Sequence, residues 1–197
     1  MKKRGFTIIE VVLVLAIAGL IFLMVFIALP ALQRSQRNTR RRQDISRIST
    51  AVTQYLASNN KLPFWVDGSK AVLDYKFATN YIESDAKCYD SSNNACTENI
   101  KGKRAEASFK CDAGDCSEFS DPDGTPYGFI YFGNNSNVSS FLGSDKVADN
   151  YKNHAIYVST KVKCSGDDNV FISADGANDF ALAYILEGGS VYCVDNS

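Results

Sequence analysis

The sequence lacks most of the residue patterns that enzymes use for acid–base or nucleophilic catalysis. Among 197 residues there is one histidine, His154. The motifs G-x-S-x-G, H-E-x-x-H and G-x-x-x-x-G-K-[ST] do not occur. A single histidine near a predicted strand is more often a structural residue than a catalyst. These absences predict a protein that is not an enzyme.

Cysteine is missing from the first 87 residues, and all six cysteines lie in the polar remainder. An even number of cysteines behind an apolar segment predicts disulfides formed outside the cytoplasm. Zinc is the weaker interpretation, because the Cys111 and Cys116 spacing has no matching second pair of ligands. The connectivity stays open, and the candidate pairs are Cys88–Cys96, Cys111–Cys116 and Cys164–Cys193.

The net charge of −1 hides two regions of opposite sign. Residues 1–47 carry nine Lys or Arg against Glu10 and Asp44, a net charge of +7, so residues 48–197 carry −8. This asymmetry predicts a basic segment near a membrane, followed by an acidic soluble head.

Residues 6–29 form an apolar run that only Thr7, Glu10 and Gly19 interrupt. A helix of this length rises about 36 Å, and a bilayer core is about 30 Å thick. The basic residues before the run predict a cytoplasmic N-terminus and an exported head. The run is too long for an ordinary cleaved signal, whose apolar core has about 7 to 15 residues.

Helical periodicity continues beyond Pro30, with an apolar stripe formed by Ile45, Ile48, Val52 and Tyr55. We therefore expect one helix over residues 6–59, loosened near Pro30 because proline removes a backbone hydrogen bond. Arginines between residues 34 and 47 are interpreted as solvated polar cover, and binding of nucleic acid is the weaker alternative. These arginines are Arg34, Arg37, Arg40, Arg41, Arg42 and Arg47.

The rest of the chain divides into an irregular part and a β part. Residues 61–120 are expected to be a disulfide-fastened connection with one short helix near 69–82. Apolar runs between turn residues then predict an antiparallel meander, with a hairpin at the EGGS turn of 187–190. The expected strands cover residues 127–132, 155–162, 169–174, 180–187 and 190–194.

Two Asp-rich stretches, SDPDG at 120–124 and DGANDF at 175–180, offer oxygen ligands of the kind that calcium prefers. The candidate ligands are Asp121, Asp123, Asp175 and Asp179. Neither stretch has the ligand spacing of an EF-hand, and Asp/Asn/Gly turns between strands are the preferred explanation of both. The sequence therefore predicts no cofactor, and calcium is the weaker alternative.

GFTIIE at 5–10, with the apolar run after it and ALPALQ at 28–33, resembles the N-terminus of type IV pilins and pseudopilins. The resemblance implies that a prepilin peptidase cuts between Gly5 and Phe6, that Phe6 is then N-methylated, and that Glu10 guides assembly. Pro30 lies three residues later than the usual proline of the family. DPDGTPYG also resembles the DPWGxPY turn of the major type II secretion pseudopilin, near which calcium binds, but Asp123 stands where that turn has tryptophan.

The resemblance implies an α+β type IV pilin fold, in which a long N-terminal helix packs on a C-terminal antiparallel sheet. The expected parts are a leader at 1–5, a transmembrane and filament-core half-helix at 6–29, an amphipathic half-helix at 30–60 and a head at 61–197. The implied role is that of a pilus subunit, a major pilin first, serving adhesion, twitching motility or DNA uptake. A minor pilin or type II secretion pseudopilin is the alternative, and a membrane-anchored enzyme or sensor is more remote.

The partners that the resemblance implies are further copies of the chain, the prepilin peptidase, an inner-membrane assembly platform and an assembly ATPase. The expected location is the cytoplasmic membrane before assembly and an extracellular pilus afterwards.

Overall fold

The computed structural model describes residue 5 and residues 7–84, 86–110, 120–133, 154–166 and 171–196. The predicted Cys111–Cys116 pair, Phe6 and residues 1–4 of the leader lie outside this part. Contacts divide the chain into two compact units, residues 1–39 and residues 40–197, which are treated separately below.

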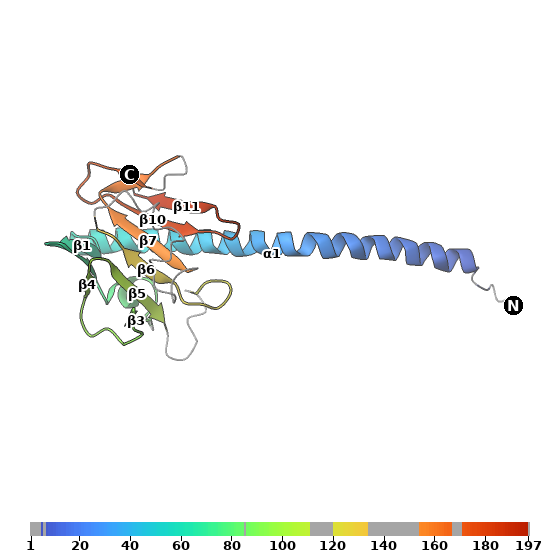
Figure 1. Cartoon of the computed structure of the whole chain (residues 1–197), viewed down its shortest axis with the longest axis horizontal. Coiled ribbons are helices and arrows are strands. Elements are labelled where there is room, and N and C mark those ends of the chain that lie inside the picture. The colour runs from blue at the N-terminus through green and yellow to red at the C-terminus, as the bar shows by residue number, and fades with distance from the viewer. Residues whose placement is uncertain are drawn as a thin grey trace. The chain divides into compact units, whose positions relative to one another are not determined.

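One long helix, α1 (Ile8–Asn59), forms the N-terminal part of the chain and contains Pro30 without interruption (Figure 1). The sequence predicted this helix over nearly the same residues. It ends where Asn60 adopts a left-handed conformation, φ 53°, and donates its backbone N–H to the Leu56 carbonyl at 2.9 Å. Asparagine tolerates this conformation better than most residues, so it forms a C-terminal cap.

The head contains one short helix and eleven strands in the described residues, arranged as three sheets (Figure 1). The six-stranded sheet has the order β11-β10-β7-β6-β5-β3, the three-stranded sheet β1-β2-β4, and the last sheet pairs β8 with β9. The elements are β1 (Phe64–Asp67), β2 (Lys70–Leu73), α2 (Phe77–Tyr81), β3 (Lys87–Asp90), β4 (Ile100–Gly102), β5 (Ala105–Lys110), β6 (Gly128–Tyr131), β7 (Ala155–Thr160), β8 (Val162–Cys164), β9 (Phe171–Ser173), β10 (Phe180–Ile185) and β11 (Val191–Asp195).

The large sheet buries both of its faces, and alternation along each strand decides which side chain faces which layer. On β10, Phe180, Leu182 and Tyr184 join one hydrophobic cluster, whereas Ala181 and Ala183 join another. The first cluster includes the apolar stripe of α1, and the second is completed by the β8–β9 pair. Residues 40–59 of α1 and the β8–β9 pair therefore cover opposite faces of this sheet. The side chains that α1 contributes to the first cluster are Ile45, Ile48, Ala51, Val52 and Tyr55.

The expected antiparallel meander was wrong in two places. β6 and β7 pair in parallel, because the long connection between Tyr131 and Ala155 permits a crossover. The run at 155–162 is split at Lys161, where the chain leaves the large sheet and enters the small β8–β9 sheet. The predicted hairpin at 187–190 is confirmed: it joins the antiparallel strands β10 and β11, with positive φ at Gly188 and Gly189.

The irregular connection expected at 61–120 was also wrong, because residues 64–110 contain five strands. The helix expected near 69–82 is limited to α2, and residues 70–73 are β2 instead. β1 and β2 pair across a two-residue turn between Asp67 and Lys70, in which Gly68 adopts φ 62°. β3 and β4 are short and polar, so their pairing comes from tertiary partners and not from a sequence pattern.

Candidate functional site

The first turn of α1 is closed by a capping box formed by Thr7 and Glu10. Glu10 Oε2 accepts hydrogen bonds from the Thr7 backbone N–H and hydroxyl, each at 2.8 Å, and the Glu10 N–H donates to Thr7 Oγ1 at 3.4 Å. Thr-x-x-Glu is the sequence signature of this arrangement, since each side chain satisfies a backbone or hydroxyl donor at the helix start. The carboxylate is therefore held at the surface of the first turn, in a fixed place.

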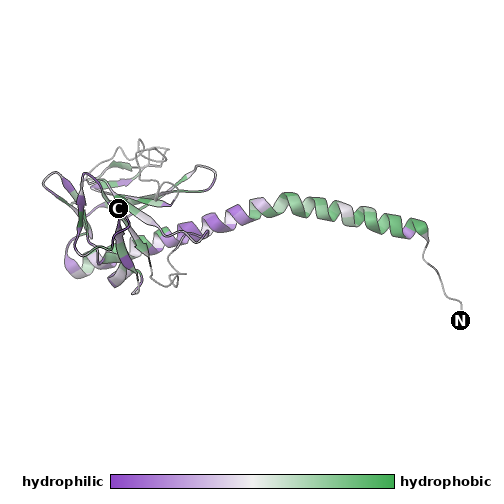
Figure 2. Ribbon diagram, turned by 60° about the horizontal axis from the view of Figure 1, so that its bottom comes forward, coloured by the Kyte–Doolittle hydropathy of each residue, from purple (hydrophilic) through white to green (hydrophobic). Residues whose placement is uncertain are grey.

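The apolar segment after Glu10 is exposed on all sides within its unit. Every large hydrophobic side chain from Ile8 to Leu32 has an exposed fraction between 44% and 85%. Figure 2 shows the hydrophobic colour on all sides of this part of α1, and hydrophilic colour after it. The helix is long and apolar enough to cross a membrane. A surface of this composition needs lipid or other protein to cover it.

Gly5 lies just before the capping box, and nothing comes within 4 Å of the position that a Cβ atom would take there. The predicted cleavage point therefore lies next to an open residue on its N-terminal side. Phe6 and the methylation expected on it are outside the described residues.

A second cluster of charged groups lies inside the head, around Arg41 of α1. Its guanidinium binds Asp121 in a bidentate manner, with Nε at 2.6 Å from Oδ2 and Nη2 at 2.7 Å from Oδ1. Nη1 donates to Glu187 Oε1 at 2.8 Å, and the Tyr184 hydroxyl donates to Asp121 Oδ2 at 2.8 Å. Arg41 and Asp121 are 5% and 1% exposed. This buried pair fastens residues 40–59 of α1 to the Asp121 turn.

The electrostatics of the cluster favour the ionised pair. Burial by itself would raise the pKa of Asp121, but the imidazole of His154, the guanidinium of Arg41 and the hydroxyl of Tyr184 together lower this pKa well below its usual value. The neighbouring carboxyl of Asp44 behaves differently: burial raises its pKa, although it accepts a hydrogen bond from the Tyr127 hydroxyl at 2.8 Å.

The sequence interpretation of Arg41 as solvated cover was wrong. Extending the stripe of Ile45 and Ile48 by one turn toward the N-terminus gives positions 41 and 44, which are both buried in the structure. The periodicity therefore contained the signal, but the charge of Arg41 and Asp44 ended the stripe too early. Charged residues are rarely buried unless they are paired, and their partners lie some 80 residues away in sequence.

The four aspartates of the calcium prediction are not gathered into one set in the described residues. Asp121 and Asp123 form a compact group with His154, with the ligand-type atoms within 4.8 Å of one another. Asp175 and Asp179 are not part of this group. Both oxygens of Asp121 already bind Arg41, whose positive charge disfavours a cation beside it. The group thus fits a calcium ion poorly, and calcium binding stays a prediction.

Two of the three candidate disulfides are present in the described residues. Cys88–Cys96 closes the loop after β3, and Cys164–Cys193 joins β8 to β11. The first bridge fastens the edge of the large sheet, and the second fastens the small sheet to the opposite edge strand.

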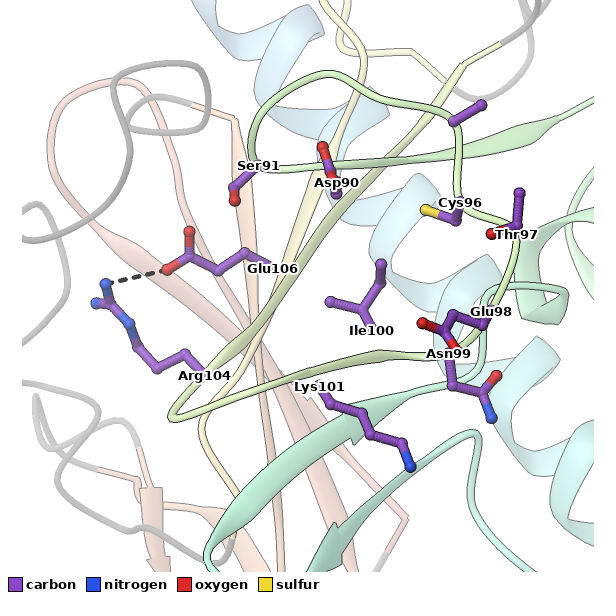
Figure 3. A pocket seen from close by; sticks show the side chains of 11 residues that line it. Asp90, Ser91, Cys96, Thr97, Glu98, Asn99, Ile100, Lys101, Arg104 and Glu106 are labelled. Atoms are coloured by element: carbon purple, nitrogen blue, oxygen red, sulfur yellow. Dashed lines mark ion pairs between the residues drawn. The ribbon is translucent and has the colours of Figure 1, made fainter.

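A polar cavity of about 420 Å³ lies beside the Cys88–Cys96 loop (Figure 3). Arg104 pairs with Glu106 at 3.0 Å, as the dashed line shows, and the Asp90 carboxylate accepts backbone N–H bonds of 2.9 Å from Ser92 and Asn94. These charges already have partners inside the protein, and the geometry assembles no nucleophile with a base. We assign no catalytic role to this cavity.

The comparisons with known proteins concern the N-terminal segment. Residues 1–26 match the family model described as the prokaryotic N-terminal methylation motif. This motif is the class III signal peptide of type IV pilins and pseudopilins. This motif, followed by a long apolar helix and an α+β head, is consistent with the pilin fold. No match was found among curated proteins or among solved structures.

Proposed function

We propose that the chain is a structural subunit, a major pilin, of a type IV pilus-like surface filament that serves adhesion, twitching motility or DNA uptake. The observation that carries this proposal is an apolar helical segment that is exposed within its own unit in the described residues and that begins, inside the methylation motif, with the exposed carboxylate of Glu10. The subunit is held in the cytoplasmic membrane before assembly and joins the filament after cleavage between Gly5 and Phe6.

The exposed segment has two successive environments in this proposal. Fully burying one Leu, Ile or Phe side chain contributes about 1.5 to 3 kcal/mol, so the whole segment is strongly driven out of water. Lipid covers it in the precursor, and the same segments of other copies cover it in the filament core. The driving force for polymerisation is therefore already present in the monomer.

Glu10 sets the register of assembly. A carboxylate within the bilayer costs about 2.5 to 3.5 kcal/mol at the helix centre, and less near the interface. Cleavage creates an α-ammonium on Phe6, and in a low dielectric this group is a strong partner for the Glu10 carboxylate of a neighbouring subunit. A subunit in the wrong register leaves the carboxylate unpaired, so it is rejected. The prepilin peptidase, the assembly platform and the assembly ATPase are the partners that this route requires.

A pseudopilin of type II secretion is the second candidate. The observation in its favour is the turn at Asp121, which resembles the DPWGxPY turn and is fixed by the N–H of Gly124 bonding to the Asp121 carbonyl at 2.7 Å. Sheared cell-surface filaments that contain this chain as the main component support the major pilin. Their absence, together with a secretion defect, supports the pseudopilin.

Mass spectrometry of the N-terminus tests processing. We expect a mature chain that begins with methylated Phe6, and a working protein that keeps Met1 would overturn the proposal.

Replacement of Glu10 tests the register argument. Glu10→Val is expected to insert and to be cleaved normally, yet to yield few filaments. Without the carboxylate, a subunit that docks in the wrong register is no longer penalised, so misplaced subunits are not rejected. Glu98→Val, which removes an exposed carboxylate of the head, is the matched control and should assemble normally. Normal filaments from Glu10→Val would contradict the register role.

A further inference from the structure

A second cavity, of about 330 Å³, lies in the head where α1 ends. Its wall is formed by the start of β1, the corner between β7 and β8, and the loop before β10. The volume is within the usual range of small-ligand pockets, about 300 to 1,000 Å³. Its chemistry differs from that of the cavity in Figure 3, which is lined by carboxylates as well as by Lys101 and Arg104.

The wall of this cavity carries positive charge, whereas the head as a whole is acidic. The lining residues include Lys61 and Lys161 but no carboxylate, whereas residues 48–197 carry a net charge of −8. Both lysines are exposed, and the structure gives the Lys161 ammonium no partner among the described residues. The Lys61 ammonium lies 4.9 Å from the centre of the Trp65 ring. Two cations at the mouth of one cavity favour an anionic ligand.

The uncharged part of the wall combines an aromatic face with amides. Trp65 is partly buried and lines the cavity together with the exposed residues Asn60 and Asn178. An aromatic ring provides a flat apolar contact, and amide side chains both donate and accept hydrogen bonds. A sugar ring matches this combination, since it has an apolar C–H face and hydroxyl groups around its edge.

The backbone at Lys161 gives an independent indication. Lys161 adopts φ 56°, its N–H donates to the Asp179 carbonyl at 2.7 Å, and its carbonyl accepts from the Ala174 N–H at 2.9 Å. This corner requires a left-handed residue, and glycine would adopt it at lower cost than lysine. The backbone thus explains the conformation at this position but not the choice of lysine, a residue that lines the cavity.

We propose that this cavity binds a terminal acidic sugar of a glycan. The sugar carboxylate lies between the ammonium groups of Lys61 and Lys161, the ring stacks on Trp65 and the amides of Asn60 and Asn178 bind hydroxyl groups. Nucleic acid fits less well, because it presents a charge at every nucleotide to an acidic head and requires a track of cations and stacking platforms. The proposal is independent of the filament class, since the cavity lies wholly within residues 40–197.

The single tryptophan makes the test direct, because Trp65 reports its own cavity by fluorescence. The full chain in detergent micelles is titrated with sialyllactose and cellobiouronic acid, and with their neutral counterparts lactose and cellobiose. We expect a saturable fluorescence change with at least one acidic sugar. Its neutral counterpart should bind about tenfold more weakly, because it lacks one charge-assisted hydrogen bond.

Variants identify the cations. Lys161→Gly keeps the left-handed backbone, Lys61→Gln keeps the side-chain length, and each should weaken binding about tenfold. Lys163→Gln, on the exposed face of β8 and outside the cavity, is the matched control and should bind like the unmodified chain.

Three results would overturn the proposal. They are the absence of a saturable change with both acidic sugars, an equal loss of binding in Lys163→Gln and Lys161→Gly, and tighter binding of a thymidine oligonucleotide than of the acidic sugars.

Discussion

Two segments of the same helix differ in how their hydrophobic side chains are distributed and exposed. Between Ile8 and Leu32, large hydrophobic side chains occur on every face and all of them are exposed. Between Ile45 and Tyr55 they form one stripe, and this stripe is buried against the head sheet. The head covers the second segment, while the described residues of its own unit give the first segment no cover. The apolar surface left exposed in the described residues therefore belongs to the first segment.

The acidic residues of the two regions differ in the same way. Glu10 is exposed and bound by Thr7 of its own turn, so it is available to another subunit. Asp121 is buried and fully engaged by Arg41, Tyr184 and its own turn. One carboxylate lies at the exposed start of α1, where the proposed function uses it, and the other serves the internal structure of the head.

The largest effect should come from Arg41→Ala. Removing one partner of a buried ion pair leaves Asp121 uncompensated and should lower the free energy of unfolding of the head by about 3 to 5 kcal/mol. Denaturant unfolding of the full chain in detergent measures this change. Arg34→Ala, an exposed arginine of the other segment, should change it by less than about 0.5 kcal/mol. Equal stability of the two variants would show that the buried cluster does not fasten the helix.

Two isoleucines of α1 sharpen the comparison further. Ile48 is 0% exposed and Ile21 is 57% exposed. Ile48→Ala should cost about 3 kcal/mol of head stability through lost burial and a residual cavity. Ile21→Ala should leave unfolding of the head unchanged and reduce filament yield instead. Denaturant unfolding measures the head stability of both variants, and quantification of sheared filaments measures their filament yield. A loss of head stability in Ile21→Ala would contradict the division into two segments.

A smaller effect is expected from pH. The lowered pKa of Asp121 means that the folded head binds a proton there less readily than the unfolded chain does. Its contribution to stability is therefore complete above the unfolded pKa near 3.8 and is lost as the pH falls below that value. Asp121→Asn should lower the free energy of unfolding of the head by about 2 kcal/mol at pH 7, because a hydrogen bond between charged groups is lost.

Unfolding of the unmodified chain and of Asp121→Asn from pH 7 to pH 2 checks this prediction. The stability difference should shrink at the acid end. A difference that stays constant over this range would mean that Asp121 is not ionised in the fold. Protonation of Asp44 and Glu106, whose pKa values are raised by burial, acts in the opposite direction in both proteins and cancels in the comparison.

The sequence predicted what depends on local pattern. The long helix and the hairpin at Gly188 follow from periodicity and turn chemistry within a few residues. The parallel pairing of β6 with β7 depends on strands far apart in sequence, so no local pattern contains it. The helical stripe extends to Arg41, but its partner Asp121, 80 residues away, could not be read from a local pattern. The strands of residues 64–110 were missed for the same reason, because short polar strands such as β4 are formed by their neighbours.

The smallest effect is expected at the helix start. Thr7→Ala removes the hydroxyl that caps α1 and should destabilise its first turn by about 1 kcal/mol. Hydrogen exchange at the backbone amides of Ile9 and Glu10, measured in detergent micelles, should accelerate by about fivefold. Thr7→Ser, which keeps the hydroxyl, should restore slow exchange. Unfolding of the head should be the same in all three proteins, because the cap belongs to the uncovered segment. Unchanged exchange in Thr7→Ala would mean that Glu10 is held in place by something other than Thr7.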